Sequence, residues 1–398
     1  MGGGRPAVGL TCWVRYTFTQ MRRTDIDGLR ILICAGIILQ HALHIFAAEP
    51  RYHLKSVELS LTASAVFEFF RATTMPAFFV IAGWSAVVSL RRRSPGRFVS
   101  ERTLRLLVPL VTGIVLFGSI IKYIELSQGR DLGLHGFRLV DALQVGFFEF
   151  FPRYLTHWEL LTWSHLWFLL YLFLITVLLL PPLVWLARSA PRTTVPAAFA
   201  VYLPALPMAA LLVAFNGYWP YFPNLVTDWN NFGYYALCVA IGAGIAAWPG
   251  FEVRLRREAP RLLALTGIAF ASLVLCGESA AGRLFVGLTA WGAIGAGLGY
   301  AARIDPPATP VFTYLSEATQ PVYIVHHVIL LLLALAILPL AIPVWFKIVL
   351  IWLGATVIVM AAYHWLIRPW PPVRWLMGMA PQIPKAMHTS ATEPPLSL

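Results

Sequence analysis

Two residues of one apolar segment, Arg30 and His41, have side chains that can do chemistry at a meaningful spacing. Eleven helical residues at about 100° each return to within about 20° of the starting direction and rise about 16 Å. Arginine binds phosphate through its planar fork, and histidine exchanges a proton near neutral pH. The pair predicts phosphate binding at one end of a helix and proton transfer further along it. The alternative is a snorkelling arginine anchor and a histidine satisfied by packing.

A second basic pair, Arg102 and Arg105, opens a later apolar segment with the sequence RTLR. The two residues are three apart and would share one helical face. Together with Arg30 they could bind a diphosphate and a third phosphate, because guanidinium groups make charge-assisted bonds to phosphate. The 16 Å rise from Arg30 to His41 is comparable with an extended phosphopantetheine arm, so a thioester could reach His41. Taken alone, the pair would be an orientation signal.

Composition indicates the elements that hold these residues. The chain has 398 residues, of which 59% are apolar and only 12% charged, and its net charge is +12. Soluble domains carry about 25% charged residues, so this is the composition of an integral membrane protein. The arginines lie in short clusters between apolar runs, which argues against a nucleic-acid partner. The four cysteines, at 12, 34, 238 and 276, have no metal-binding spacing, and no metal site is expected.

Apolar runs long enough to cross a bilayer predict an all-α, polytopic membrane protein with about ten transmembrane helices. The ten predicted spans are residues 29–47, 63–90, 104–121, 165–187, 195–215, 231–248, 260–276, 284–302, 314–338 and 343–367. Gly295 and Gly299, four residues apart, predict a close helix–helix contact.

The positions of Lys and Arg predict the orientation. With a cytoplasmic N-terminus, 21 of the 30 basic residues fall on the inside, which favours a multi-pass plasma (inner) membrane protein with both termini cytoplasmic. The longest outer segment, 122–164, contains an aromatic-rich stretch expected to lie on the bilayer or to roof a cavity. Residues 21–376 form the predicted transmembrane domain. Residues 1–20 are expected to be a flexible extension, with Met21 an alternative start to Met1, and 377–398 a polar, Pro-containing cytoplasmic tail.

Five motifs in order resemble the acyltransferase-3 family of integral membrane O-acyltransferases. They are R-x10-H ending at His41, MPAFFVIAGW at 75–84, RTLR at 102–105, HLWFLLYL at 165–172 and PVYIVHHV at 321–328. The run HLWFL and the stretch at 230–249 resemble the branch of glucan-modifying succinyltransferases. The resemblance extends from about Arg22 to Pro369. One departure is Ala82, which stands where the family usually has serine.

The resemblance implies transfer of an acyl group, acetyl most commonly, from cytoplasmic acyl-CoA to a hydroxyl of an extracytoplasmic glycan, lipid or small molecule. By motif match, His41 takes the catalytic position, and Arg30, Arg102 and Arg105 take the donor-binding positions. His326 follows Tyr323 in the family's Tyr-x-x-His pattern and is the preferred supporting histidine. His327 should point about 100° away from it and therefore lie elsewhere. Direct transfer and a covalent acyl-histidine both remain open.

Further candidates near the acceptor or behind His41 are weaker. They are His44, Arg71, His165 and Trp167, for which packing, snorkelling and aromatic-belt roles are the alternatives. Asp27 lies too far along the helix to orient His41, so a carboxylate partner must come from elsewhere. The candidates are Glu125, Asp141, Glu149 and Glu159.

The rival interpretation is a polytopic transporter or a non-catalytic binding protein, for which internal inverted symmetry would be expected and is not found in the sequence. No Ser-His-Asp order, P-loop or HExxH motif points to hydrolysis, phosphoryl transfer or metal chemistry. The acceptor, the acyl group and the oligomeric state are not determined by the sequence.

Overall fold

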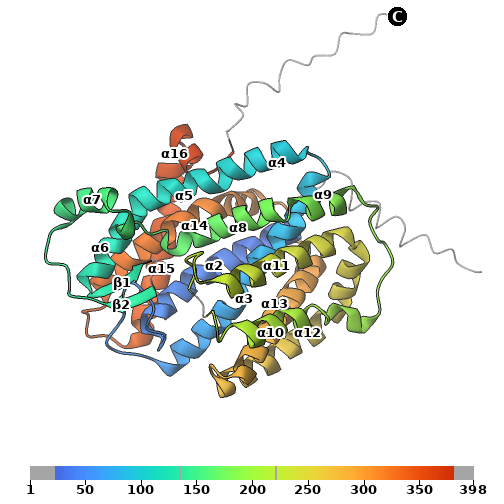
Figure 1. The fold of residues 1–398 in the computed structure, drawn as a ribbon, viewed down its shortest axis with the longest axis horizontal. Helices are drawn as coiled ribbons and strands as arrows, with labels where there is room; N and C mark the ends of the chain where they lie inside the picture. The colour runs from blue at the N-terminus through green and yellow to red at the C-terminus, as the bar shows by residue number, and fades with distance from the viewer. Residues whose placement is uncertain (1–22, 134–135, 220–221, 381–398) are drawn as a thin grey trace, which may run out of the picture.

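The structure is a computed structural model that describes residues 23–133, 136–219 and 222–380, and these are almost entirely helical (Figure 1). The long helices are α2 (Thr24–Phe46), α3 (Leu61–Leu90), α11 (Trp229–Ala247), α12 (Pro249–Cys276), α13 (Ala280–Ile304), α14 (Pro310–Ile337) and α15 (Val344–Ala362). The shorter helices are α4 (Pro95–Arg102), α5 (Val108–Gly113), α6 (Ser119–Ser127), α7 (Phe147–Thr156), α8 (Trp167–Leu178), α9 (Leu180–Arg188), α10 (Ala205–Phe215) and α16 (Pro371–Leu376). The predicted extension 1–20 and most of the tail 377–398 lie outside the described residues.

The count of about ten spans is too high. In the described part of the chain, seven helices are long and apolar enough to cross a membrane, or eight if the bent pair at 164–188 is one span. The predicted span 195–215 is divided into a short 3-10 helix, Ala198–Val201, and the 11-residue helix α10, which rises about 16 Å and cannot cross a core of about 30 Å. The predicted span 231–248 corresponds to α11, whose asparagines and tyrosines make it less apolar. The all-α polytopic class is confirmed.

Helix starts follow local sequence. The Ser60 Oγ accepts the N–H of Ala63 at 3.2 Å at the start of α3, and the Thr309 Oγ1 accepts the N–H of Phe312 at 3.2 Å at the start of α14. Such caps satisfy N–H groups that have no partner within the helix. The bent pair has an equally local cause, since α8 and α9 meet at 64° just before Pro181 and Pro182, which cannot donate backbone hydrogen bonds.

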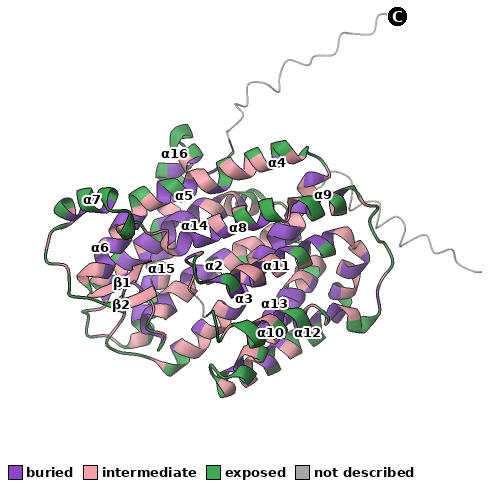
Figure 2. Cartoon of the chain, in the orientation of Figure 1, coloured by how far each residue is buried: buried purple, intermediate pink, exposed green. Residues whose placement is uncertain are grey.

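Glycines allow the central helices to approach closely. A Cβ on Gly242 of α11 would lie 1.8 Å from the Val80 carbonyl of α3, and one on Gly83 would lie 2.0 Å from the Val239 carbonyl. On α13, a Cβ on Gly299 would lie 2.5 Å from the Leu255 carbonyl of α12. The close contact predicted from Gly295 and Gly299 is therefore confirmed. Buried residues concentrate where these helices meet (Figure 2).

The third span is one apolar stretch from Pro95 to Ser127 that is not a regular α-helix throughout. The segments Thr103–Leu107 and Ile114–Gly118 are wound as π-helix, and a third π segment, Tyr363–Ile367, follows α15. Such wider turns occur frequently at functional sites. They change the angle between residues three apart, so the shared face expected for Arg102 and Arg105 is not that of a regular helix.

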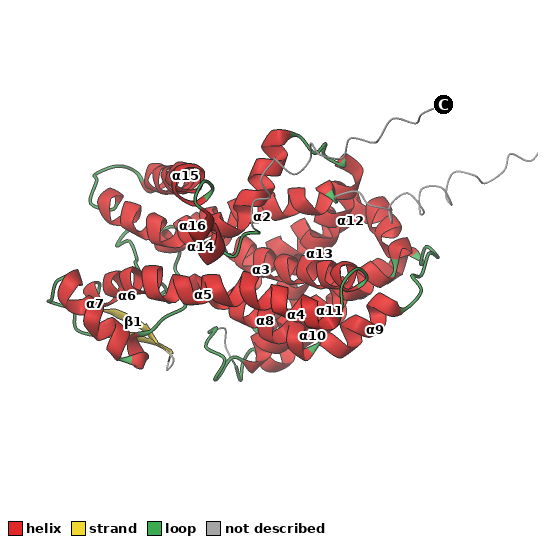
Figure 3. Cartoon of the chain, turned by 90° about the horizontal axis from the view of Figure 1, so that it is seen from above, coloured by secondary structure: helices red, strands yellow, loops and turns green. Residues whose placement is uncertain are grey.

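The segment 122–164 contains more than the expected helix. It includes α7 and also a two-stranded antiparallel hairpin of β1 (Arg130–Gly133) and β2 (Gly136–Leu139), with Arg130 opposite Leu139. Both lie beside α6 at one end of the molecule (Figures 1 and 3). This end also carries the cavity described next.

Candidate functional site

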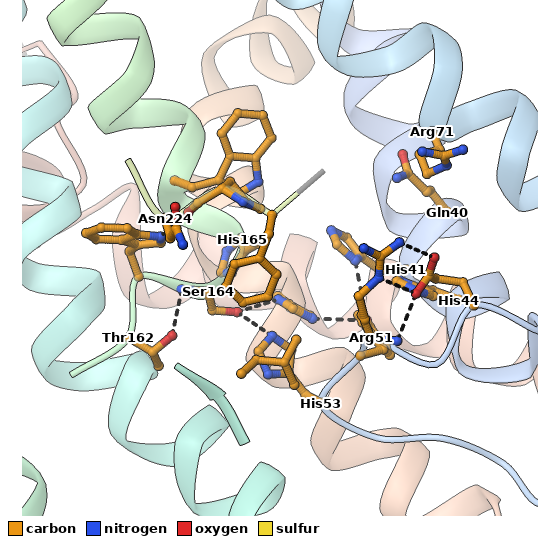
Figure 4. A pocket seen from close by; sticks show the side chains of 18 of the residues that line it. Gln40, His41, His44, Arg51, His53, Arg71, Thr162, Ser164, His165 and Asn224 are labelled. Atoms are coloured by element: carbon orange, nitrogen blue, oxygen red, sulfur yellow. Dashed lines mark hydrogen bonds and ion pairs between the residues drawn. The ribbon is translucent and has the colours of Figure 1, made fainter. Parts of the chain in front are cut away.

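The main cavity has a volume of about 180 Å³ and lies where α2 ends. Its walls come from α2, α3, α14, β1, the start of α8 and three connecting segments (Figure 4). The lining residues are Gln40, His41, His44, Glu49, Arg51, Tyr52, His53, Phe67, Arg71, Leu132, Gly133, Leu161, Thr162, Trp163, Ser164, His165, Trp167, Phe222, Pro223, Asn224 and His327. Four of the histidines discussed above therefore line one cavity: His41, His44, His165 and His327. The fifth, His326, lies behind the cavity wall.

His41 is in contact with a phenol and a second imidazole. The Tyr52 hydroxyl is 3.3 Å from His41 Nδ1 and 3.0 Å from His327 Nε2. The rings of His41 and His327 stack with centroids 4.4 Å apart. Burial raises the pKa of Tyr52 well above its usual range, so the phenol keeps its proton and can donate to one histidine while accepting from the other. A proton can pass between the two rings through this hydroxyl.

A second hydrogen-bonded group meets the first at Ser164. His53 Nε2 is 2.9 Å from the Ser164 Oγ, and His53 Nδ1 is bound to a carboxylate oxygen of Glu125. The same Oγ is 3.3 Å from Nδ1 of His327. Glu125 is fully buried and is also bound by Lys122 Nζ and the Leu132 N–H, both at 2.6 Å. The result is a continuous chain of hydrogen-bonding groups from Glu125 to His41.

His165 and His326 are held by backbone carbonyls. His165 Nε2 faces the carbonyls of Tyr323 and Ile324, each at 3.1 Å, and His326 Nδ1 faces the Tyr323 carbonyl at 2.7 Å. A nitrogen that faces a carbonyl must carry the proton, which fixes the tautomer of both rings. The Tyr323 hydroxyl donates to the His165 carbonyl. These contacts join α14 to the start of α8 behind the cavity, and the His326 ring is 5.3 Å from that of His41.

The remaining acceptor-side candidates also lie at the cavity. The His44 ring stacks between Tyr52 and Phe67, at 4.2 and 4.1 Å, so packing accounts for its position. Arg71 is paired with Glu68 at 2.5 Å. Lys55 donates to the His44 and Ala47 carbonyls and so closes the end of α2. Burial and the nearby Arg130 lower the pKa of Lys55 to about 8.

The donor-binding candidates lie at the opposite end of α2. Arg30 is about 16 Å before His41 on the same unbroken helix and is 3.4 Å from the Asp27 carboxylate. Arg102 lies over the Phe98 ring, and the positive charges of Arg105 and Arg30 act on it. Within the described ranges, neither Arg102 nor Arg105 forms an ion pair. The structure brings the three arginines together, but the cavity lining does not reach them.

Several cavity residues were missed or misplaced by the sequence analysis. The prediction that His327 points elsewhere is wrong: it touches Tyr52 and Ser164, because α14 contributes both of its adjacent histidines to the cluster. Tyr52, His53 and Ser164 were not singled out. Ser164 directly precedes the HLWFL motif, and Tyr52 and His53 lie in the segment that connects the first span to the second. Of the carboxylate candidates, Glu125 is the one that belongs to this series of hydrogen-bonded groups, but it binds His53 and not His41.

No ordinary metal-ligand set is formed by this histidine cluster. Among residues 23–133, 136–219 and 222–380, no group of three or more His, Cys, Asp or Glu could hold a metal ion. The imidazoles are engaged with a phenol, a hydroxyl and backbone carbonyls, which is the environment of proton transfer.

Comparison with known proteins identifies the family of the chain. The family model described as "Acyltransferase domain" matches residues 23–365. The proteins named "Glucans biosynthesis protein C" from Shigella dysenteriae serotype 1 (strain Sd197) and Escherichia coli (strain K12) are each 28% identical over 159 residues, which cover 39% of this chain and 38% of theirs. The match thus spans well under half the length of these relatives. No solved structure matches. Since the family model spans nearly the whole membrane domain, the chain belongs to the acyltransferase-3 family of membrane acyltransferases.

Proposed function

We propose that this protein transfers an acyl group, acetyl or a similar one, from cytoplasmic acyl-CoA to a hydroxyl group of an extracytoplasmic glycan. The observation that carries the proposal is α2, one continuous helix with Arg30 near its start and His41 near its end. The helix separates a cluster of arginines from a cluster of proton-exchanging groups by about the length of a phosphopantetheine arm.

The arginine end has the properties of a phosphate site. Arg30, Arg102 and Arg105 act on one another electrostatically, and like charges held together gain most from an anionic ligand. The guanidinium fork suits the diphosphate and the third phosphate of CoA. In this proposal the arginines hold CoA at the cytoplasmic surface, with both termini on the same side, while the thioester extends toward His41.

The cavity end has the properties of an acceptor site. His41 Nδ1 is bound to Tyr52, so Nε2 is the nitrogen we assign as the base for the acceptor hydroxyl. The indoles of Trp163 and Trp167 line the same cavity, together with Asn224 and Arg71. Aromatic faces and amide or guanidinium donors suit sugar rings and their hydroxyls. The name of the relatives refers to the biosynthesis of glucans, which makes a glycan the preferred acceptor.

The test is transfer by the purified protein in lipid nanodiscs. Radiolabelled acetyl-CoA and succinyl-CoA are supplied with glycans extracted from a strain that lacks the gene, and the label on the glycan is counted. His41→Gln should bind CoA normally and lose nearly all transfer, because glutamine keeps a polar side chain that cannot take up the proton. The exposed His157 supplies the matched control His157→Gln. Label that never leaves CoA, with substrate instead moved across a vesicle membrane, would favour a transporter.

A further inference from the structure

The hydrogen-bonded series Ser164–His53–Glu125 places a hydroxyl, an imidazole and a carboxylate in the order used for nucleophilic catalysis. We propose that Ser164 is a covalent acyl carrier: it accepts the acyl group from acyl-CoA as an ester on Oγ and then yields it to the acceptor. This inference rests on the proposed acyl transfer from CoA and specifies its chemical path. It makes Ser164 and His53 catalytic residues that the sequence does not reveal, since their order along the chain is His, Glu, Ser.

The nitrogen atoms are correctly placed for this role. His53 presents Nε2 to the Ser164 Oγ at 2.9 Å and Nδ1 to Glu125, so its two ring nitrogens face the nucleophile and the carboxylate respectively. A carboxylate on Nδ1 fixes the tautomer in which Nε2 accepts the serine proton. The side chain of Glu125 is 0% exposed and that of His53 7% exposed, so both groups act away from bulk water.

Glu125 is held in place by groups that leave it no freedom to turn. Lys122 Nζ binds its second oxygen at 2.6 Å, and the Leu132 N–H from β1 binds that same oxygen at 2.6 Å. Lys122 is itself paired with Asp131 of β1. The hairpin therefore serves to fix the carboxylate, which gives a function to a β element in an otherwise helical protein.

The backbone of Ser164 is in an unusual conformation. Its φ is 44°, in the left-handed region that residues other than glycine seldom adopt, and its N–H donates to the Thr162 Oγ1 at 3.1 Å. Such strain is stored mainly at functional sites. The residue begins the helical stretch Ser164–Leu178, whose helix dipole would favour the negative charge that develops on an attacked carbonyl oxygen. Ser164 also lines the cavity.

A second series of hydrogen bonds connects Ser164 to His41. The Oγ is 3.3 Å from His327 Nδ1, and His327 Nε2 reaches His41 through the Tyr52 hydroxyl. One cavity thus holds a nucleophile with its own base and a separate histidine joined to it by hydrogen bonds. Two half-reactions need two proton exchanges. His53 can serve the first, and the hydrogen bonds from Ser164 to His41 can serve the second.

In the first half-reaction, His53 Nε2 takes the proton of Ser164 and Oγ attacks the thioester carbonyl. The new C–O bond forms as the C–S bond breaks, and the proton on His53 passes to the departing sulfur, giving CoA-SH and acyl-Ser164. In the second, His41 takes the proton of the acceptor hydroxyl, whose oxygen attacks the ester. The Ser164 C–O bond breaks, and a proton delivered through Tyr52 and His327 restores the hydroxyl.

The experiment is isotope exchange without acceptor. An acyl-enzyme that forms reversibly must exchange labelled CoA into unlabelled acetyl-CoA, whereas direct transfer cannot do so without the acceptor. The purified full chain in nanodiscs is incubated with acetyl-CoA and radiolabelled CoA, and the label in acetyl-CoA is counted. The protein quenched in acid is digested and searched by mass spectrometry for an acetyl ester on Ser164.

The variants separate chemistry from folding. Ser164→Ala should abolish exchange, and so should Ser164→Gly, which relieves the left-handed backbone and cannot fail through strain. Ser164→Cys should restore exchange and carry the acetyl group as a thioester that hydroxylamine releases. His41→Gln should keep exchange and accumulate acetyl-Ser164 while losing transfer to glycan. The matched control is Ser127→Ala, since the Ser127 Oγ makes no hydrogen bond in the structure.

The outcomes distinguish the two proposals. Exchange that depends on Ser164 supports the acyl-serine. Transfer to glycan without exchange, or full transfer by Ser164→Gly, overturns the acyl-serine and leaves the proposed function intact. An acetyl group found on His41 instead of Ser164 also overturns it. A wild-type protein that neither binds acetyl-CoA by calorimetry nor transfers from it refutes the proposed function itself.

Discussion

The two ends of α2 are built in opposite ways. At the cavity end, imidazoles, a phenol, a hydroxyl and a carboxylate bind one another at hydrogen-bond distance and come from many separate segments. At the arginine end, like charges come from α2 and from the start of the third span, and they do not bind one another. Proton transfer requires heavy atoms within about 3 Å, whereas attraction of a phosphate tolerates several ångströms. The cavity end should therefore be the more sensitive to small changes.

The largest effect is expected from His41 at the cavity end. His41→Gln should lower acyl transfer by about 10²–10⁴-fold, the usual contribution of a positioned base, while CoA binding stays within twofold because the arginines lie about 16 Å away. The measurement is transfer of label from acetyl-CoA together with CoA affinity by calorimetry. Equal losses of both would show that the two ends are not separable.

A loss of stability is expected from Lys122. Its side chain is 1% exposed and is paired with Glu125 and Asp131, so Lys122→Met leaves buried negative charge without a partner. Breaking such a pair costs about 3–5 kcal/mol. Thermal unfolding in detergent should show a lowered midpoint, and Arg153→Met, which removes an exposed pair with Glu149, should leave it unchanged. An unaltered midpoint for Lys122→Met would mean that the hairpin does not fix Glu125.

At the arginine end, the expected effect is on binding alone. Arg102→Ala and Arg105→Ala should each weaken acetyl-CoA binding by about 1.5–3 kcal/mol, the value of a hydrogen bond to a charged group, while the transfer rate at saturating donor is kept. Arg188 is exposed at the end of α9, on the side predicted to be cytoplasmic, so Arg188→Ala is the matched control. Unchanged acetyl-CoA affinity in the double variant would mean that Arg102 and Arg105 only orient the helix in the membrane.

A smaller effect concerns Asp228, which borders the cavity through Phe222. Burial raises its pKa to about 6 from 3.8, although Asn231, Tyr171 and the Phe222 N–H bind it. Because the folded value is the higher one, its contribution to stability is complete below 3.8 and is lost as the pH rises through about 6. The unfolding temperature of the wild type should therefore fall over this range relative to that of Asp228→Asn. Parallel curves for the two proteins would contradict the shift.

The least perturbing test concerns which end faces the cytoplasm. Arg97 is 71% exposed in α4, so Arg97→Cys should keep full activity. In intact cells of a background without other reactive cysteines, a membrane-impermeant maleimide should label it only after permeabilisation. Labelling of intact cells would reverse the two ends and with them the direction of acyl transfer.

Much of the fold was available from the sequence because burial in lipid leaves a strong local signal. Each of the ten predicted segments contains helix, and apolar runs near 29–47 or 314–338 identify themselves by length. Whether a given helix is long enough to cross the membrane by itself depends less on local sequence. α10 is cut short by the turn at 202–204, and α11 owes its place to the glycine contacts with α3.

The sequence by itself determined the membrane class, the family motifs and the pairing of Arg30 with His41, since both lie on one helix and helical geometry is regular. Only the tertiary structure decided that His53, Glu125 and Ser164, which are 111 residues apart from first to last, meet in one cavity with His327. Hydrogen bonds between side chains of distant segments depend on distances of a few tenths of an ångström. No sequence period encodes these distances, and they arise from the tertiary packing that brings α2, α6, α8, α14 and the hairpin together.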